Sequence, residues 1–296
     1  MPGAVSRLHS WALPLLAWDR RIDVVGGLTL AILLLTTQKV WGLQIVLVPL
    51  VVAAVVDRRL MRAPGYWLAV LAVYAVGVAP SVLELDNHEF LLAYWLLALG
   101  LARAGADPAA GLATSARLLV GAAFAFAVLW KAVTPEYLSG DAFHGFLRLD
   151  PRFLGLDAAL SDLTLADGDR TRAVASALRV VGDEGVWVAV RDRPEVGGLA
   201  AVMTGWTLAI EAAVAACFLA PPTSRVGRAR DAALLVFLFT TYVLAPVLGF
   251  GWLLVAMGMA QSPLERRPWR AAAYAAAFVL VLARATAPVS WLLSLL

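Results

Sequence analysis

Lys131 is the residue in this sequence that most clearly suggests chemistry. It is one of two lysines, with Lys39, among 24 basic residues, and it lies at the end of an apolar segment. A lysine that is shielded from water can lose its proton and act as a general base, which an arginine cannot do. A second interpretation is that the side chain extends to the lipid headgroups, with Trp130 and Tyr137 as interfacial anchors.

A polar turn at residues 84–89 carries the next set of reactive groups. Asp86, Asn87 and His88 follow one another there. In one interpretation Asn87 and His88 face a cavity and orient a reacting group. In the other, Asn87 caps the following helix and Glu89 lies near the positive end of the helix dipole.

Two charged residues stand inside apolar segments. Glu211 lies within residues 198–219, and Arg284 lies within residues 271–293. Ionisable groups inside a membrane are costly, so they indicate either a functional site or a buried polar contact. Glu211 is interpreted as a proton-relay acid or as a protonated glutamate bonded between helices, and Arg284 is its predicted partner.

The remaining polar candidates are weaker. Glu136 and His144 lie in a polar stretch and are interpreted as solvated, and Glu136 and Tyr137 are retained as further site candidates because they follow Lys131. Cys217 is the single cysteine, and the three histidines lie far apart, so no disulfide and no multi-histidine metal site is expected. No phosphate-binding glycine motif is present, and nucleic acid is not an expected partner.

The elements that must position these groups are membrane helices. Hydrophobic residues make up 61% of the chain and charged residues 15%, which excludes a soluble globular protein and a disordered one. We predict an all-α, polytopic transmembrane bundle of about nine spans, with breaks at residues 36–39 and 246–251. The nine apolar segments are residues 24–38, 40–56, 66–83, 89–105, 116–134, 198–219, 230–246, 248–263 and 271–293.

Charge predicts the orientation of these spans. With the N-terminus cytoplasmic, most arginines fall on inner flanks, whereas the loop 135–197 carries 11 acidic residues and seven arginines. We therefore expect a multi-pass cell-membrane protein with an interfacial segment at residues 1–21, a single transmembrane domain at residues 22–296 and an extracytoplasmic loop of about 60 residues. Within that loop we predict an amphipathic helix at 169–181, and a short strand or apolar plug at 186–190.

Several motifs occur in the order found in one known family. The segment 86–91, Asp-Asn-His-Glu-Phe-Leu, resembles the Asn-Asn-His-Ser-Tyr-Leu stretch of vitamin K-dependent γ-glutamyl carboxylase and its bacterial relatives, the HTTM-domain membrane proteins. The segment 124–140 resembles their Tyr-Phe-x-Ala-Gly-x-x-Lys-Leu-x-x-Asp-Trp-x-x-Gly signature. The segment 207–213 is similar to their span with an intramembrane acid, and 241–263 to the hairpin that follows it.

The resemblance implies a fold and a site. In that family the signature lysine is the proposed base that deprotonates a reduced quinone at the lumenal face, and the Asn-His pair lines the same site. Lys131 would then be the base, Asn87 and His88 its neighbours, and Glu211 the intramembrane acid. The charge-based topology places Lys131 and His88 on the same side of the membrane, as this resemblance requires.

The sequence also departs from the family pattern. Lys131 lies six residues before Tyr137, which replaces the family's tryptophan, and this spacing is one residue longer than the family's. The hairpin beginning at Tyr242 lacks the usual histidine. The sequence through Leu296 shows no counterpart of the large lumenal domain, so carboxylation of a protein substrate is not expected.

Three functions follow from this sequence. The first is quinone- or lipid-linked chemistry in an outward-facing cavity with Lys131 as base. The second is a non-catalytic lipid- or quinone-binding or scaffolding subunit with a membrane-protein partner. The third is a transporter that uses Glu211 and Arg284, and the absence of a visible inverted repeat disfavours it.

Overall fold

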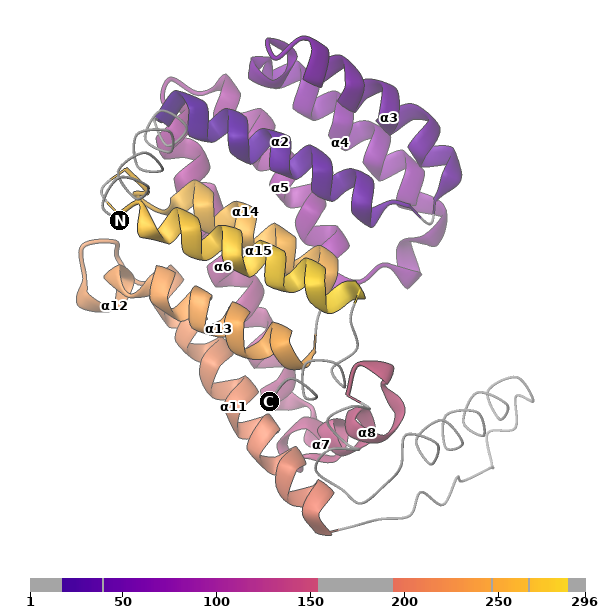
Figure 1. Cartoon of the computed structure of the whole chain (residues 1–296), viewed down its shortest axis with the longest axis vertical. Helices are drawn as coiled ribbons and strands as arrows, with labels where there is room; N and C mark the ends of the chain where they lie inside the picture. Colours follow the sequence, from indigo (N-terminus) through magenta and orange to yellow (C-terminus); the bar gives the residue numbers. More distant parts are fainter. Residues whose placement is uncertain (1–17, 39, 154–193, 246, 266, 287–296) are drawn as a thin grey trace, which may run out of the picture.

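The computed structural model describes residues 18–38, 40–153, 194–245, 247–265 and 267–286 (Figure 1). This part of the chain is 86% helix and has no strand, in agreement with the predicted all-α class. Its nine long helices are α2 (Trp18–Thr36), α3 (Trp41–Val56), α4 (Pro64–Val78), α5 (Asn87–Ala104), α6 (Pro108–Val133), α11 (Pro194–Leu219), α13 (Arg230–Leu244), α14 (Leu248–Gln261) and α15 (Trp269–Thr286).

Short helices connect some of the long ones. They are η1 (Leu60–Arg62), η2 (Ala79–Glu84), α7 (Pro135–Leu138), α8 (Asp141–Leu149), η3 (Pro151–Phe153) and α12 (Arg225–Arg228). The first helix break lies where the sequence indicated it, because α2 ends at Thr36 and α3 begins at Trp41. The second break lies earlier than predicted, because α13 ends at Leu244 and α14 begins at Leu248, so that Gly249 and Gly251 lie within α14.

Three helices begin well before the predicted segments. Helix α2 begins at Trp18 rather than at residue 24. Helix α6 begins at Pro108 rather than at residue 116, because the Asp107 carboxylate accepts a hydrogen bond of 2.9 Å from the Ala110 N–H and Pro108 needs no N–H partner at the first position. Helix α11 begins at Pro194 rather than at residue 198. A proline therefore begins both α6 and α11 ahead of their apolar segments.

Three stretches of the described chain are long and apolar enough to cross a membrane: Pro64–Glu84, Pro108–Val133 and Val196–Leu219. Shorter apolar helices occupy Ile22–Thr36, Trp41–Val56 and Leu248–Gln261. Large apolar side chains are exposed along α3, among them Trp41, Ile45 and Val56. In water such a surface would be costly, and it suits contact with lipid.

Helix α14 lies at the centre of the bundle, where it packs against α2, α6 and α15 (Figure 1). Most of its side chains are buried, and glycines let neighbours approach closely. A Cβ atom at Gly251 would lie 2.7 Å from the Tyr242 ring, and one at Gly258 would lie 2.4 Å from the Tyr274 ring. These two glycines therefore fix how α13 and α15 pack on α14.

Helix α11 extends past the end of α6, and the short helices α7 and α8 lie against this extension (Figure 1). Phe143, Leu147 and Phe153 form a small apolar cluster with Val196 and Ala200 of α11. The first part of the predicted loop 135–197 is thus helical and packed. The predicted helix at 169–181, the predicted strand or plug at 186–190, and most of the predicted interfacial segment 1–21 lie outside the described residues.

Candidate functional site: a buried lysine–glutamate pair

Lys131 and Glu211 form a buried ion pair between α6 and α11. The Lys131 Nζ donates hydrogen bonds to both carboxylate oxygens of Glu211, at 2.9 Å to Oε1 and 2.7 Å to Oε2. The lysine side chain is 14% exposed and the glutamate side chain 10% exposed. The Lys131 side chain is therefore held by a protein carboxylate, and the interpretation that it extends to lipid headgroups is wrong.

The packing of α6 against α11 brings the two groups together. The helices run antiparallel, and Gly121 of α6 lies so close to α11 that a Cβ atom there would meet the Leu219 side chain at 2.7 Å. Lys131 lies in the last turn of α6, where the helix dipole favours a cation. Glu211 lies in the interior of α11, eight residues before its last residue, Leu219.

The predicted contact between Glu211 and Arg284 is wrong, because the carboxylate is bonded to Lys131 instead. The Arg284 Nε donates a hydrogen bond of 2.8 Å to the Val243 carbonyl. Helix α13 ends at Leu244, so that carbonyl receives no N–H from a following helical turn. Arg284 therefore caps α13 and places a cation at the negative end of its dipole.

Two tyrosines lie near the ion pair. The Tyr137 ring centroid is 5.6 Å from the Lys131 Nζ, within the range of a cation–π interaction. Burial and the Glu211 carboxylate both raise the pKa of the Tyr137 phenol, so it remains neutral. Tyr242 of α13 is 1% exposed and lies within electrostatic range of Glu211 and Arg152. These two tyrosines add hydroxyl groups to the otherwise apolar surroundings of the ion pair.

The structure places His88 apart from Lys131. The His88 ring lies over the backbone of Gly249, where an added Cβ would meet it at 2.6 Å, and its Nδ1 is 3.9 Å from an Asp86 carboxylate oxygen. No hydrogen bond or ion pair joins His88 to Lys131 in the described chain. Phe250, next to Gly249, packs against Phe124, and Lys131 lies about 10 Å further along α6.

The other candidates of the polar turn and the loop are separate from the ion pair. Asp86, not Asn87, is the N-cap residue of α5, and its backbone N–H donates a hydrogen bond of 2.8 Å to the Glu89 carboxylate. Asn87 and Glu136 are exposed, and His144 is half-buried on α8. The described residues hold no group of three metal-ligating side chains.

Asp150 and Arg152 form an ion pair in the segment that follows α8. Arg152 donates hydrogen bonds to both carboxylate oxygens of Asp150. Burial raises the pKa of the Asp150 carboxyl, but the hydrogen bonds and positive charge of Arg152 outweigh burial and hold that pKa below its ordinary value. Arg152 also lies within electrostatic range of Asp86 and Tyr242. It therefore links the segment after α8 electrostatically to the ends of α5 and α13.

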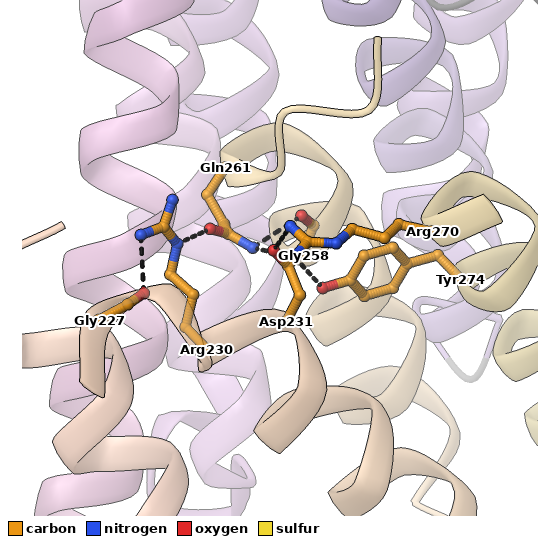
Figure 2. A network of polar contacts seen from close by, with 7 residues as sticks. All are labelled: Gly227, Arg230, Asp231, Gly258, Gln261, Arg270 and Tyr274. Carbon is orange, nitrogen blue, oxygen red and sulfur yellow. Dashed lines mark hydrogen bonds and ion pairs between the residues drawn. The ribbon is translucent and has the colours of Figure 1, made fainter. Parts of the chain in front are cut away.

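Sequence reasoning missed a second polar network, at the other end of the bundle (Figure 2). Asp231 is 1% exposed and accepts hydrogen bonds from Gln261 (2.7 Å), Tyr274 (2.8 Å) and Arg270. Arg230 in turn donates to Gln261 and to the Gly227 carbonyl. An acid at the first turn of an apolar helix was the available signal. Asp231 was overlooked because the arginines around it were interpreted only as markers of the cytoplasmic side.

Comparison with protein-family models, curated proteins and solved structures finds no match to this chain. The resemblance to the γ-carboxylase-like membrane proteins therefore stays a prediction. The candidate site rests on the arrangement of the described side chains.

Proposed function

We propose that this chain is a multi-pass membrane protein whose nine long helices all cross the bilayer, with a cytoplasmic N-terminus and the loop 135–197 outside. The apolar surfaces of the helices support membrane insertion. The orientation is supported by the charge distribution, because the arginine-rich turns and the acid-rich loop fall at opposite ends of the helices. In this arrangement Lys131 and Glu211 lie toward the extracytoplasmic side.

Within this frame, the Lys131–Glu211 pair is the centre of a site that binds a lipid-soluble molecule, with a reduced quinone as the favoured class. The observation that carries the proposal is a bidentate, buried ion pair in a bundle otherwise dominated by apolar side chains. A buried ion pair is weak evidence for stability, since well-packed apolar residues often serve as well. Its presence between apolar helices is therefore better explained by a function.

The pair can supply a base without leaving a net charge in the membrane. A proton moves from Lys131 Nζ to a Glu211 oxygen, which leaves a neutral amine and a neutral carboxylic acid. The amine then takes the hydroxyl proton of a bound hydroquinone, so that an ammonium group faces a quinol monoanion. Tyr137 is placed to orient the bound ring, because it already lies beside the ammonium group. The catalytic hypothesis thus gives Glu211 a defined role as proton acceptor.

A second candidate function is non-catalytic binding of a lipid or quinone in a larger membrane complex. One observation favours it: among the described residues, no hydrogen bond or ion pair joins His88 or Asn87 to Lys131. In that case the ion pair would hold a ligand or a helix interface without turnover.

The test is to identify small molecules that copurify with the protein. The protein is purified from membranes in mild detergent, and bound molecules are identified by mass spectrometry for wild type, Lys131→Ala and Lys131→Arg. We expect a quinone or a specific lipid in wild type and its loss from Lys131→Ala. Quinol turnover in membranes then separates the two functions, because a base role predicts no activity in Lys131→Arg.

The control is Arg284→Gln, which removes another buried cation from the bundle without touching the ion pair. It should retain the ligand. The same bound molecules in wild type and Lys131→Ala would refute the site. Loss of the ligand from all variants, including Arg284→Gln, would mean that binding depends on general integrity of the fold.

A further inference from the structure

The Asp231 network holds more positive than negative charge. Arg230 and Arg270 share a single buried carboxylate, that of Asp231, and they reach it differently (Figure 2). Arg270 contacts the carboxylate directly, whereas Arg230 contacts only the amide oxygen of Gln261, which itself donates to Asp231. The network is thus left with one uncompensated positive charge.

Hydrogen-bond donors remain unused in this network. The Arg270 Nε is buried and has no acceptor, and the Arg270 side chain is 8% exposed. Arg230 is half-buried and uses its Nε and one terminal nitrogen, so its second terminal nitrogen is left over. A cation without a full set of partners inside the bundle is costly, and an anion that accepts a hydrogen bond from the half-buried Arg230 would lower that cost.

The surface around the network is basic and carries an interfacial aromatic residue. The segments 225–231 and 261–270 hold six arginines and two acidic residues. Arg225, Arg228 and Arg267 are exposed at this end of the bundle. The Trp269 side chain is 58% exposed, and its ring centroid lies 5.6 Å from the Arg270 guanidinium. Exposed tryptophan next to arginine is typical of side chains at the lipid headgroup level.

From this arrangement we propose that the ends of α12, α13 and α15 form a binding site for the phosphate of an anionic phospholipid headgroup. Arg230 contributes the central guanidinium, with Arg225 and Arg228 at the rim. Arginine suits this role because its planar fork can bind two phosphate oxygens at once. Basic clusters at the cytoplasmic ends of membrane helices bind acidic lipids in the same way.

The lipid source is favoured over a free phosphate ion by the position of the site. The cluster lies at helix ends that carry the exposed Trp269 and a half-exposed Val226, so an acyl chain has an apolar surface to follow. The inference rests on insertion of the bundle in a membrane, and it is independent of any role of Lys131. Variants at one end of the bundle should therefore leave the ligand at the other end unchanged.

The test uses the purified full-length protein in detergent, titrated with phosphatidylglycerol or phosphatidylcholine and followed by native mass spectrometry. We expect preferential retention of phosphatidylglycerol by wild type and about fivefold weaker retention by Arg230→Gln, the typical contribution of one arginine near an anionic surface. A second variant, Arg225→Gln/Arg228→Gln, changes exposed side chains only, and it tests the site even if Arg230→Gln disturbs folding.

The matched control is Arg58→Gln/Arg59→Gln, which removes two exposed arginines from the turn after α3. It should keep the preference of wild type. Equal losses in the control and in Arg225→Gln/Arg228→Gln would overturn the proposal, since they would indicate a general charge effect. Displacement of the lipid by glycerol 1-phosphate at the same concentration would overturn the lipid assignment in favour of a soluble anion. Equal binding of both lipids would also overturn it.

Discussion

Removing one partner of the Lys131–Glu211 pair should destabilise the protein far more than removing both. In Lys131→Met the Glu211 carboxylate stays buried without its cation, and in Glu211→Met the ammonium group stays buried without its anion. Methionine has an unbranched side chain of similar length, so it fills the space of either residue with little strain. The double variant Lys131→Met/Glu211→Met removes both charges and leaves an apolar contact between α6 and α11.

The structure sets the expected size of these effects. Both side chains are about nine-tenths buried, so solvent screening is small. Breaking a buried pair by removing one partner costs about 3–5 kcal/mol, and replacing both partners by apolar residues is often close to neutral. Each single variant should therefore lose about 3 kcal/mol, and the double variant less than about 1 kcal/mol. The coupling energy between the two positions should therefore reach about 5 kcal/mol.

The measurement is reversible unfolding in mixed detergent micelles at neutral pH, followed by tryptophan fluorescence for all four proteins. A double-mutant cycle then gives the coupling energy directly. Arg284→Met serves as a comparison, because Arg284 is a buried cation outside the Lys131–Glu211 pair, and its Nε donates to the Val243 carbonyl.

Near-additive losses would contradict this reasoning. If the double variant loses as much as the two single variants together, the two charges do not compensate each other in the folded protein. Losses below about 0.5 kcal/mol for each single variant would show that the pair behaves like an exposed one.

Three further predictions concern other parts of the fold. Asp231→Asn should cost about 3 kcal/mol in the same unfolding assay, because the buried Arg270 guanidinium loses the carboxylate that it contacts; an unchanged midpoint would contradict this. Gly258→Ala should cost about 1–3 kcal/mol, because its Cβ would lie 2.4 Å from the Tyr274 ring, whereas Gly65→Ala, with open space around the added atom, should be neutral. The pKa of Asp150 is lowered in the folded state, so its stabilising effect is complete above its ordinary value of 3.8 and is lost as the pH falls below it. In a pH series of thermal unfolding, Asp150→Asn should therefore reduce the fall of the unfolding midpoint at acid pH. The same fall in wild type and variant would refute a stabilising role of the Asp150–Arg152 pair.

The sequence alone determined the helical class and the main helix breaks. These features depend on local chemistry, because apolar segments of membrane length form helices, and Pro, Gly and polar clusters interrupt them. The breaks near Lys39 and after Leu244 follow from such local signals. Arg284 and Glu211 were also recognisable as unusual, since a charged residue in an apolar segment is visible without any neighbour.

Partnership between charges was decided by the tertiary structure. The sequence paired Glu211 with Arg284, but the antiparallel packing of α6 on α11 at Gly121 brings Glu211 to Lys131 instead. Arg284 instead donates a hydrogen bond to the Val243 carbonyl at the end of α13. This contact depends on how α15 packs against α13.

Helix packing also decides which polar groups meet at the two ends of the bundle. The charge-based topology and the family resemblance suggested a shared site for His88 and Lys131. In the described residues the His88 ring instead packs over Gly249, and no hydrogen bond or ion pair joins it to Lys131. The Asp231 network joins residues of three helices, and no local pattern encodes such a meeting. A sequence shows which charges need partners, but only the packing distances between helices determine which partners they find.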